Sequence, residues 1–93
     1  MLDIRVEDGQ VFLAGIFDAS QVVTAEEVFD KVANSTVVDF SKLEYISSAG
    51  LSVLLRTQKR LSEEGGQLTL RNLSSHISDV FRFAGFDLIF QIE

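Results

Sequence analysis

The alternation of apolar and charged positions at the start of the chain predicts a pair of strands. Leu2, Ile4 and Val6 alternate with charged residues, which is the period of two expected for a strand with one buried face. The dipeptide Asp8-Gly9 follows, and both residue types tolerate the positive φ angles of a tight hairpin turn. The run Val11–Phe17 is almost continuously apolar. We therefore expect these two segments to form an antiparallel hairpin.

The next segment, Val22 to Ala33, carries apolar residues at the spacing of an amphipathic helix. Within it, Thr24 followed by Glu27 fits a capping box, in which the two side chains satisfy the first free N–H groups of a helix. The regular helix is therefore expected to begin near Thr24 and to end at Asn34-Ser35.

Strands and helices alternate through the rest of the chain. Residues 36–40 are apolar and rich in β-branched side chains, the composition of a central strand covered on both faces, and residues 41–45 are predicted to be a connection. The remaining pattern predicts helices from Leu51 to Gly65-Gly66 and from Ser74 or Ser75 to Gly85, and strands over residues 67–71 and, as a last strand or an extended tail, 88–92.

The resulting order, β-β-α-β-α-β-α-β, predicts the fold class. It indicates a single α/β domain over residues 1–93, with right-handed crossovers onto one mixed, mostly parallel sheet flanked by helices. A chain of 93 residues is long enough for one core. It contains no internal repeat, low-complexity tract or linker that would indicate a second domain.

Composition and charge disfavour several classes of function. The chain has no cysteine and a single histidine, His76, so a typical zinc site is not expected. A net charge of −6 disfavours nucleic acid as a partner. No glycine-rich loop of the GxxxxGK[ST] or GxGxxG type occurs, so no nucleotide cofactor is expected. No apolar run reaches the length of a signal peptide or a membrane span, and we expect a cytoplasmic protein without membrane insertion.

Polar loops are predicted to gather where the parallel strands end, the usual place for a site in an open α/β sheet. These loops are residues 18–20, 40–48 and 72–75. Either Ser47 or Ser48 can cap the helix that follows, where free N–H groups and a partial positive charge are found. The small residues after Ser47 would leave this position accessible. Local pattern alone does not decide between a capping serine and a functional one.

The residues of the same region also permit an enzyme with a serine nucleophile as an alternative. Ser47 or Ser48 together with His76 and Asp18 has the composition of a hydrolase triad. The GxSxG motif of such enzymes is absent, and a domain of this size leaves little room for a substrate pocket. We therefore predict no catalytic residue and a protein that is not an enzyme.

The segment VVDFSKLEYISSAGL, residues 37–51, closely resembles the signature of the STAS family. That signature is an apolar strand, Asp-(Leu/Phe)-Ser, a short spacer, an aromatic and an apolar residue, Asp-Ser-(Ser/Thr/Ala)-Gly-Leu, and a helix. The family includes bacterial anti-sigma factor antagonists and the cytoplasmic domains of sulfate-type transporters. Gly15, Asp18, Gly65-Gly66 and the Phe81–Phe86 region also resemble its landmarks.

The resemblance implies a phosphorylation site. In antagonists that are phosphorylated, the acceptor is the serine directly after the motif Asp, and this position falls on Ser48. Ser47 stands where the family pattern has Asp, and Asp18 matches an acid that contacts the kinase. The partner-binding residues implied are Asp18, Ser47, Ser48, Ala49, Gly50, Leu51 and Ser75.

The resemblance also implies a partner-switching cycle. The unphosphorylated domain would bind an anti-sigma factor that is also a serine kinase and thereby release a sigma factor. Phosphorylation of Ser48 would block this binding, and a separate serine phosphatase would restore it. The alternative within the same family is a non-phosphorylated STAS scaffold subunit of a transporter ATPase complex.

Overall fold

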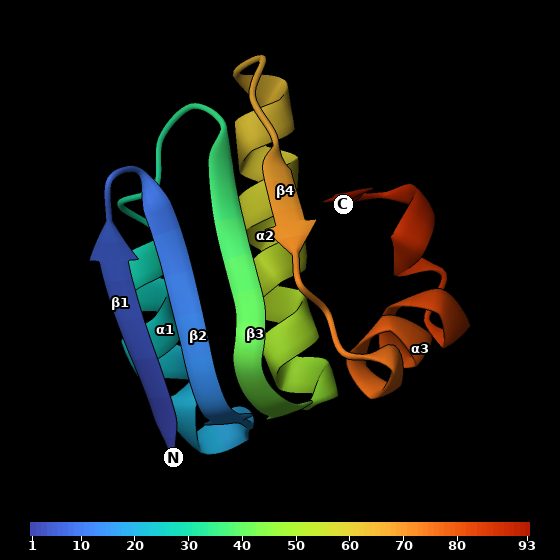
Figure 1. Ribbon diagram of the computed structural model, residues 1–93. Helices are drawn as coiled ribbons and strands as arrows, with labels where there is room; N and C mark the ends of the chain where they lie inside the picture. Colours follow the sequence, from blue (N-terminus) through green and yellow to red (C-terminus); the bar gives the residue numbers. More distant parts are fainter.

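The computed structural model describes residues 1–93 and contains one five-stranded sheet in the order β1-β2-β3-β4-β5. β1 and β2 are antiparallel, and every later pair of neighbours is parallel. The predicted α/β class and order of elements are confirmed, with two short 3₁₀ helices added (Figure 1). The elements are β1 (Leu2–Glu7), β2 (Gln10–Phe17), η1 (Ala19–Gln21), α1 (Val22–Phe29), β3 (Thr36–Ile46), α2 (Ser48–Glu63), β4 (Leu68–Arg71), α3 (Ser75–Phe83), η2 (Phe86–Leu88) and β5 (Gln91–Ile92).

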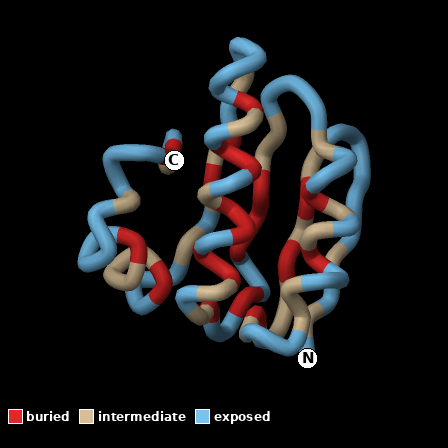
Figure 2. Tube along the Cα trace, turned by 180° about the vertical axis from the view of Figure 1, so that it is seen from behind, coloured by how far each residue is buried: buried red, intermediate tan, exposed pale blue.

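The sheet is covered on one face only. Each parallel crossover leads to the next strand in the same direction, and right-handed crossovers then place successive helices on the same side. Figure 1 shows α1 and α2 behind the sheet, and Figure 2, from the other side, shows them in front of it. The prediction that residues 36–40 form a strand covered on both faces is therefore wrong, since the side chain of Val37 lies on the uncovered face and is only partly buried.

The core lies between this sheet and the helices. Phe81 of α3 packs edge-to-face on Phe40 of β3 and on Phe90, with ring centroids 5.8 and 5.6 Å apart, and so attaches α3 and the last segment to the sheet. The buried apolar residues are Val11, Leu13, Phe17, Ala25, Phe29, Val38, Phe40, Leu43, Ile46, Leu51, Val53, Leu54, Leu61, Leu68, Leu70, Ile77, Phe81 and Phe90. No helix is both long enough and apolar enough to span a bilayer.

Helix α1 begins two residues earlier than the sequence predicts, and it ends several residues earlier, at Phe29. It begins at Val22, so Thr24 lies inside the helix and its predicted capping box is wrong; Asp18 caps the preceding turn instead. After Phe29 the chain closes with shorter, 3₁₀-type hydrogen bonds. The Arg60 guanidinium donates to the carbonyl oxygens of Phe29 and Val32, both at 2.9 Å, and so satisfies groups that a longer helix would have used.

Strand β3 continues to Ile46, through residues predicted to be a connection. Its pairing with β2 has two register shifts, each with one more residue on β3 than on β2. Such bulges change which side chains face the core: Phe40, Leu43 and Ile46 are buried at intervals of three. The alternation of period two is lost at these positions, which is why the sequence pattern did not predict a strand there.

Asp39 stabilises the first of these bulges from the uncovered face. Its carboxylate accepts hydrogen bonds from the N–H and hydroxyl of Ser41, at 2.8 and 2.6 Å, and from the Asn72 amide at 2.9 Å. Arg71 lies 3.6 Å away and also donates to Gln10. Burial raises the pKa of Asp39, but these hydrogen bonds and the charge of Arg71 outweigh it, so the pKa lies below its usual value.

The first turn of α2 lies very close to the ends of β2 and β3. A methyl group on Gly50 would come within 2.9 Å of Ile46 Cγ1 and 3.0 Å of the Phe17 ring. Only glycine fits this contact without displacement of core side chains. This contact fixes how closely the first turn of α2 approaches the ends of β2 and β3.

We expect Asp39→Asn to lower the free energy of unfolding at pH 7 by about 1–3 kcal/mol, because it weakens charge-assisted hydrogen bonds to a buried group. The lowered pKa of Asp39 stabilises the native state at pH values above the unfolded-state pKa of about 3.9, and this contribution disappears as the pH falls through the native pKa. Urea unfolding of the wild type and of Asp39→Asn, at pH 7 and at several pH values below 4, measures the difference in free energy of unfolding between them. An equal difference from the wild type at every pH would contradict this role, and Asp87→Asn, on the surface, is the control.

We expect Gly50→Ala to lower the stability by about 1–3 kcal/mol through overpacking, although alanine favours a helix by about 1 kcal/mol at an unconstrained site. Thermal or urea unfolding provides the measurement, and Lys59→Ala, on the exposed side of α2, is the matched control. An increase in stability would show that the contact relaxes without cost.

Candidate functional site

Ser47 is the residue that caps α2. Its hydroxyl accepts a hydrogen bond from Gly50 N at 3.3 Å, and its backbone is extended, as an N-cap requires. Its own N–H donates to the carbonyl oxygen of Phe17 at 2.9 Å. The sequence left open whether Ser47 or Ser48 makes the cap, and the structure assigns it to Ser47.

Ser48 is consequently free for another role. It is the first residue of the 16-residue helix α2, it is exposed, and its hydroxyl forms no hydrogen bond within the chain. The N–H groups of Ser48 and Ala49 also have no acceptor in the protein. Free N–H groups and the positive end of the helix dipole favour an anion at this position.

Asp18 lies on the segment adjacent to Ser47. It directly follows Phe17, whose carbonyl oxygen holds Ser47, so the end of β2 and the start of α2 meet here. The carboxylate accepts hydrogen bonds from the hydroxyl and the N–H of Ser20, at 2.6 and 2.9 Å. These two hydrogen bonds lower the pKa of Asp18, and the bond from the Ser20 hydroxyl has the larger effect. Asp18 therefore contributes a fixed negative charge to this edge of the sheet at neutral pH.

The three predicted partner-binding residues that follow Ser48 differ in their exposure to solvent. Ala49 is partly exposed, whereas Gly50 and Leu51 are buried. The sequence-based prediction placed all three against a partner. In the structure Gly50 and Leu51 lie beneath the surface, where they position Ser48 by packing, because Gly50 must contact Phe17 and Leu51 belongs to the core.

Ser75 occupies the first turn of α3 and is exposed. Ser74, not Ser75, caps that helix by accepting a hydrogen bond from Ile77 N at 3.1 Å. Strand β4 ends beside Asp39 on β3, which continues for seven further residues. No hydrogen bond or ion pair joins Ser75 to Asp18 or to residues 47–51, so its place in the site stays a prediction.

The hydrolase triad considered from the sequence is not assembled. The His76 side chain forms no hydrogen bond or ion pair with Ser47, Ser48 or Asp18. Asp18 is engaged with Ser20 and Ser47 with Gly50. The connected base and orienting acid that activate a serine nucleophile are therefore missing.

Exposed apolar residues beside the site were missed by the sequence reasoning. Ile16 and Tyr45 are paired across β2 and β3 on the uncovered face, and their exposed fractions are 39% and 46%. Val23, in the first turn of α1, is 69% exposed. The sequence carries only a weak signal for the exposure of Ile16. Ile16 and inward-facing Phe17 are neighbours in a strand and so point to opposite faces, but the run Val11–Phe17 is apolar at nearly every position and does not show which face is exposed.

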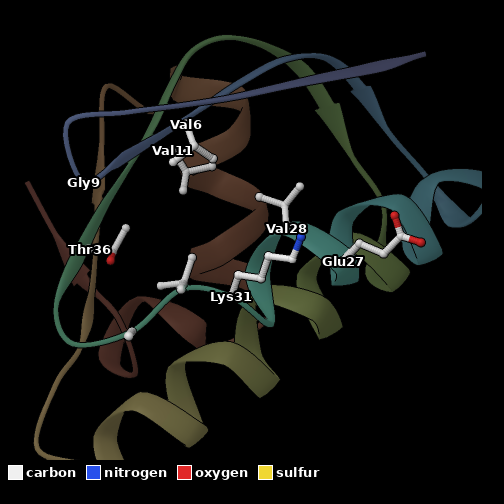
Figure 3. A pocket seen from close by; sticks show the side chains of 9 residues that line it. Val6, Gly9, Val11, Glu27, Val28, Lys31 and Thr36 are labelled. Carbon is white, nitrogen blue, oxygen red and sulfur yellow. The ribbon is translucent and has the colours of Figure 1, made fainter.

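The largest cavity, of about 520 Å³, lies at the other end of the sheet. It is bounded by the β1–β2 turn and the end of α1, and Figure 3 shows Val6, Val28 and Lys31 around it. The expectation that so small a domain leaves little room for a pocket was therefore too strict. None of the predicted site residues lines this cavity, so it offers no substrate pocket to Ser48.

Comparison with known proteins agrees with this arrangement. The chain matches the family model "Mlab, STAS domain" over residues 1–91. It is 43% identical over 63 residues to the putative anti-sigma factor antagonist BtrV of Bordetella bronchiseptica, a match that covers 68% of this chain and 54% of that protein. The matched part thus spans about half the length of this curated relative.

Solved structures with the same fold include an anti-sigma factor antagonist from Mycobacterium paratuberculosis, with a TM-score of 0.82, 22% identity and coverage of 99% of this chain and 83% of that one. The phosphorylated form of the Bacillus cell fate determinant SpoIIAA has a TM-score of 0.71 and 19% identity, with coverage of 100% and 91%. At such identities the likeness concerns the fold alone. Because the family model extends over nearly the whole sheet and all three helices, this chain belongs to the STAS domain family.

Proposed function

We propose that this protein is an anti-sigma factor antagonist in a partner-switching pathway. Its unphosphorylated form binds an anti-sigma factor that is also a serine kinase, and phosphorylation of Ser48 blocks that binding. A serine phosphatase reverses the modification. The domain contributes a binding surface and a phosphate acceptor, with no catalytic site of its own.

One observation carries this proposal: the Ser48 hydroxyl is exposed and unbonded at the start of α2. A kinase needs an acceptor hydroxyl that it can reach, and Ser48 can leave its position without breaking a cap, because Ser47 makes that cap. The similarity to BtrV supports the class of partner.

The physical effect of a phosphate differs between folding and binding. The group adds a charge of about −1.5 to −2. Within the domain it meets the free N–H groups of Ser48 and Ala49 and the positive end of α2. In an interface fitted to a small hydroxyl it brings bulk and charge, at the sheet edge to which ionised Asp18 also belongs. A loss of about 3 kcal/mol of binding free energy weakens the affinity more than a hundredfold.

Ser47 keeps one property of the Asp that usually precedes the acceptor and lacks another. Serine and aspartate are both good N-caps, and Ser47 makes the cap here. It does not carry the negative charge of an Asp. The structural basis for presenting Ser48 is therefore retained, while the charge of an Asp at position 47 is missing; Asp18, next to the Phe17 that holds Ser47, contributes its charge to the same edge of the sheet.

A second candidate is a non-phosphorylated scaffold subunit of a transporter ATPase complex. It is favoured by the absence of an acid at position 47, directly before the proposed acceptor. This candidate uses the same edge of the sheet without turnover of phosphate. Recovery of a transporter ATPase instead of a kinase in a pull-down would favour it.

We expect Ser48→Ala to bind the kinase constitutively and Ser48→Asp to bind it at least about tenfold more weakly, because the carboxylate places charge and bulk in the interface. Isothermal titration calorimetry measures both affinities. Ser62→Ala and Ser62→Asp, at the other, exposed end of α2, are the matched controls.

Phosphopeptide mapping after incubation with kinase and ATP tests the acceptor itself. We expect the label on the peptide that contains Ser48 and no label in the Ser48→Ala variant. Label that persists in this variant, or no label in the wild type, would overturn the assignment.

Ser47→Ala is expected to lower the stability by about 1 kcal/mol, because Gly50 N loses its partner. Ser47→Asp should change it by no more than about 0.5 kcal/mol, since Asp keeps the cap and interacts favourably with the helix dipole. Urea unfolding distinguishes the two variants. Equal destabilisation by both would show that the hydroxyl of Ser47 has a role other than capping.

A further inference from the structure

The strand β1 forms an open edge of the sheet. It pairs only with β2, it contains no proline, and Figure 1 shows nothing on its outer side. An open edge presents main-chain donors and acceptors to any strand of matching pattern. The question is therefore which strand would match this one.

The hairpin turn decides which residues of β1 point their main-chain groups outward. Asp8 and Gly9 have φ angles of 51° and 75°, and the turn closes on the pair Glu7–Gln10. In a two-residue hairpin the closing pair exchanges both hydrogen bonds, and bonded pairs recur at every second residue. The inward groups therefore belong to Asp3, Arg5 and Glu7. The outward groups belong to Leu2, Ile4 and Val6.

We propose that β1 pairs with β1 of a second copy of this chain, antiparallel about a two-fold axis at Ile4. Ile4 then lies opposite the partner's Ile4, and Leu2 lies opposite the partner's Val6, so that outward main-chain groups meet outward main-chain groups. On the other face, Asp3 lies opposite the partner's Arg5. A two-fold axis repeats each of these contacts, as in most homodimers.

The charges select this register over its neighbours. A shift by two residues in one direction places Arg5 opposite the partner's Arg5 and Asp3 opposite the partner's Glu7. The opposite shift places Asp3 opposite the partner's Asp3. Like charges directly across a strand pair are destabilising, and a shift by one residue brings inward groups against outward ones. Of this register and the neighbouring ones, only the register centred on Ile4 is both bonded and charge-complementary, and it pairs residues 2–6 of the strand.

The isolated domain leaves the contributing side chains available. Asp3 takes part in no ion pair. Arg5 pairs with Glu7 and stacks on Phe12, 4.8 Å from the ring centroid, yet its side chain is 60% exposed. Val6 is 58% exposed although it lies on the helix side of the strand. In the dimer the partner's Leu2 would cover it.

This dimer leaves the proposed phosphorylation site open, because β2 separates β1 from β3 and α2. A single strand pair is a small interface, and small interfaces are weak and transient. We expect a rapid monomer–dimer equilibrium with a dissociation constant of roughly 10 to 500 μM.

Complementary charge reversals test the register. In Asp3→Arg every cross-strand contact becomes Arg against Arg, and in Arg5→Asp it becomes Asp against Asp. Each variant alone should dimerise at least about tenfold more weakly than the wild type. An equimolar mixture of the two should associate, because both contacts of the mixed dimer then join opposite charges: the new Arg at position 3 of one variant faces the new Asp at position 5 of the other, and Arg5 of the first faces Asp3 of the second.

Sedimentation equilibrium over a concentration series measures all of these species. Asp87→Arg and Lys59→Asp, which change the net charge equally at exposed sites away from β1, should dimerise like the wild type. A wild type that stays monomeric up to about 1 mM, single variants that dimerise normally, or a mixture that fails to associate would each overturn the proposal. Circular dichroism of the single variants confirms that they are folded.

Discussion

The geometry of the site depends on the close contact between the first turn of α2 and the ends of β2 and β3. The Phe17 carbonyl oxygen holds Ser47 N at 2.9 Å, and Gly50 leaves no space for a methyl group between the helix and the rings and side chains below it. This contact places Ser47 in the capping position and turns Ser48 outward. A hydroxyl without hydrogen bonds at a helix N-terminus is the result.

The same contact explains how one residue can control binding without controlling folding. The groups that hold the helix end are the Ser47 hydroxyl, the Gly50 N–H and the Phe17 carbonyl, and none of them belongs to the Ser48 side chain. A charge on Ser48 therefore meets unused N–H groups instead of replacing used ones. In the proposed switch, most of the cost of the modification would fall on a partner that approaches this edge.

The sequence predicted those features that depend on residue type and spacing. The opening hairpin followed from alternation and Asp8-Gly9, and the start of a helix near Ser47-Ser48 from small polar residues before an apolar pattern. The functional role of Ser48 was inferred from the resemblance to the STAS signature and stays a prediction. Prediction from the sequence failed where long-range contacts decide the outcome. Arg60 donates to the carbonyl groups at the end of α1, so the helix ends early. Two bulges interrupt the alternation in the second half of β3. No second helix layer covers Ile16 and Tyr45, which are therefore exposed. Each depends on a partner remote in the sequence or on topology, which local periodicity does not encode.

The most direct test is an NMR titration of the isotope-labelled protein, with and without phosphoserine installed at position 48, by the anti-sigma factor kinase. Without the phosphate, the amide signals of residues 18–20 and 47–52 should shift or broaden on addition of the kinase. With the phosphate, the spectrum should keep its dispersion, with changes confined to the start of α2 and its neighbours, and should not respond to the kinase. Equal binding by both forms, or loss of dispersion throughout the sheet on phosphorylation, would contradict a switch that acts on binding and spares the fold.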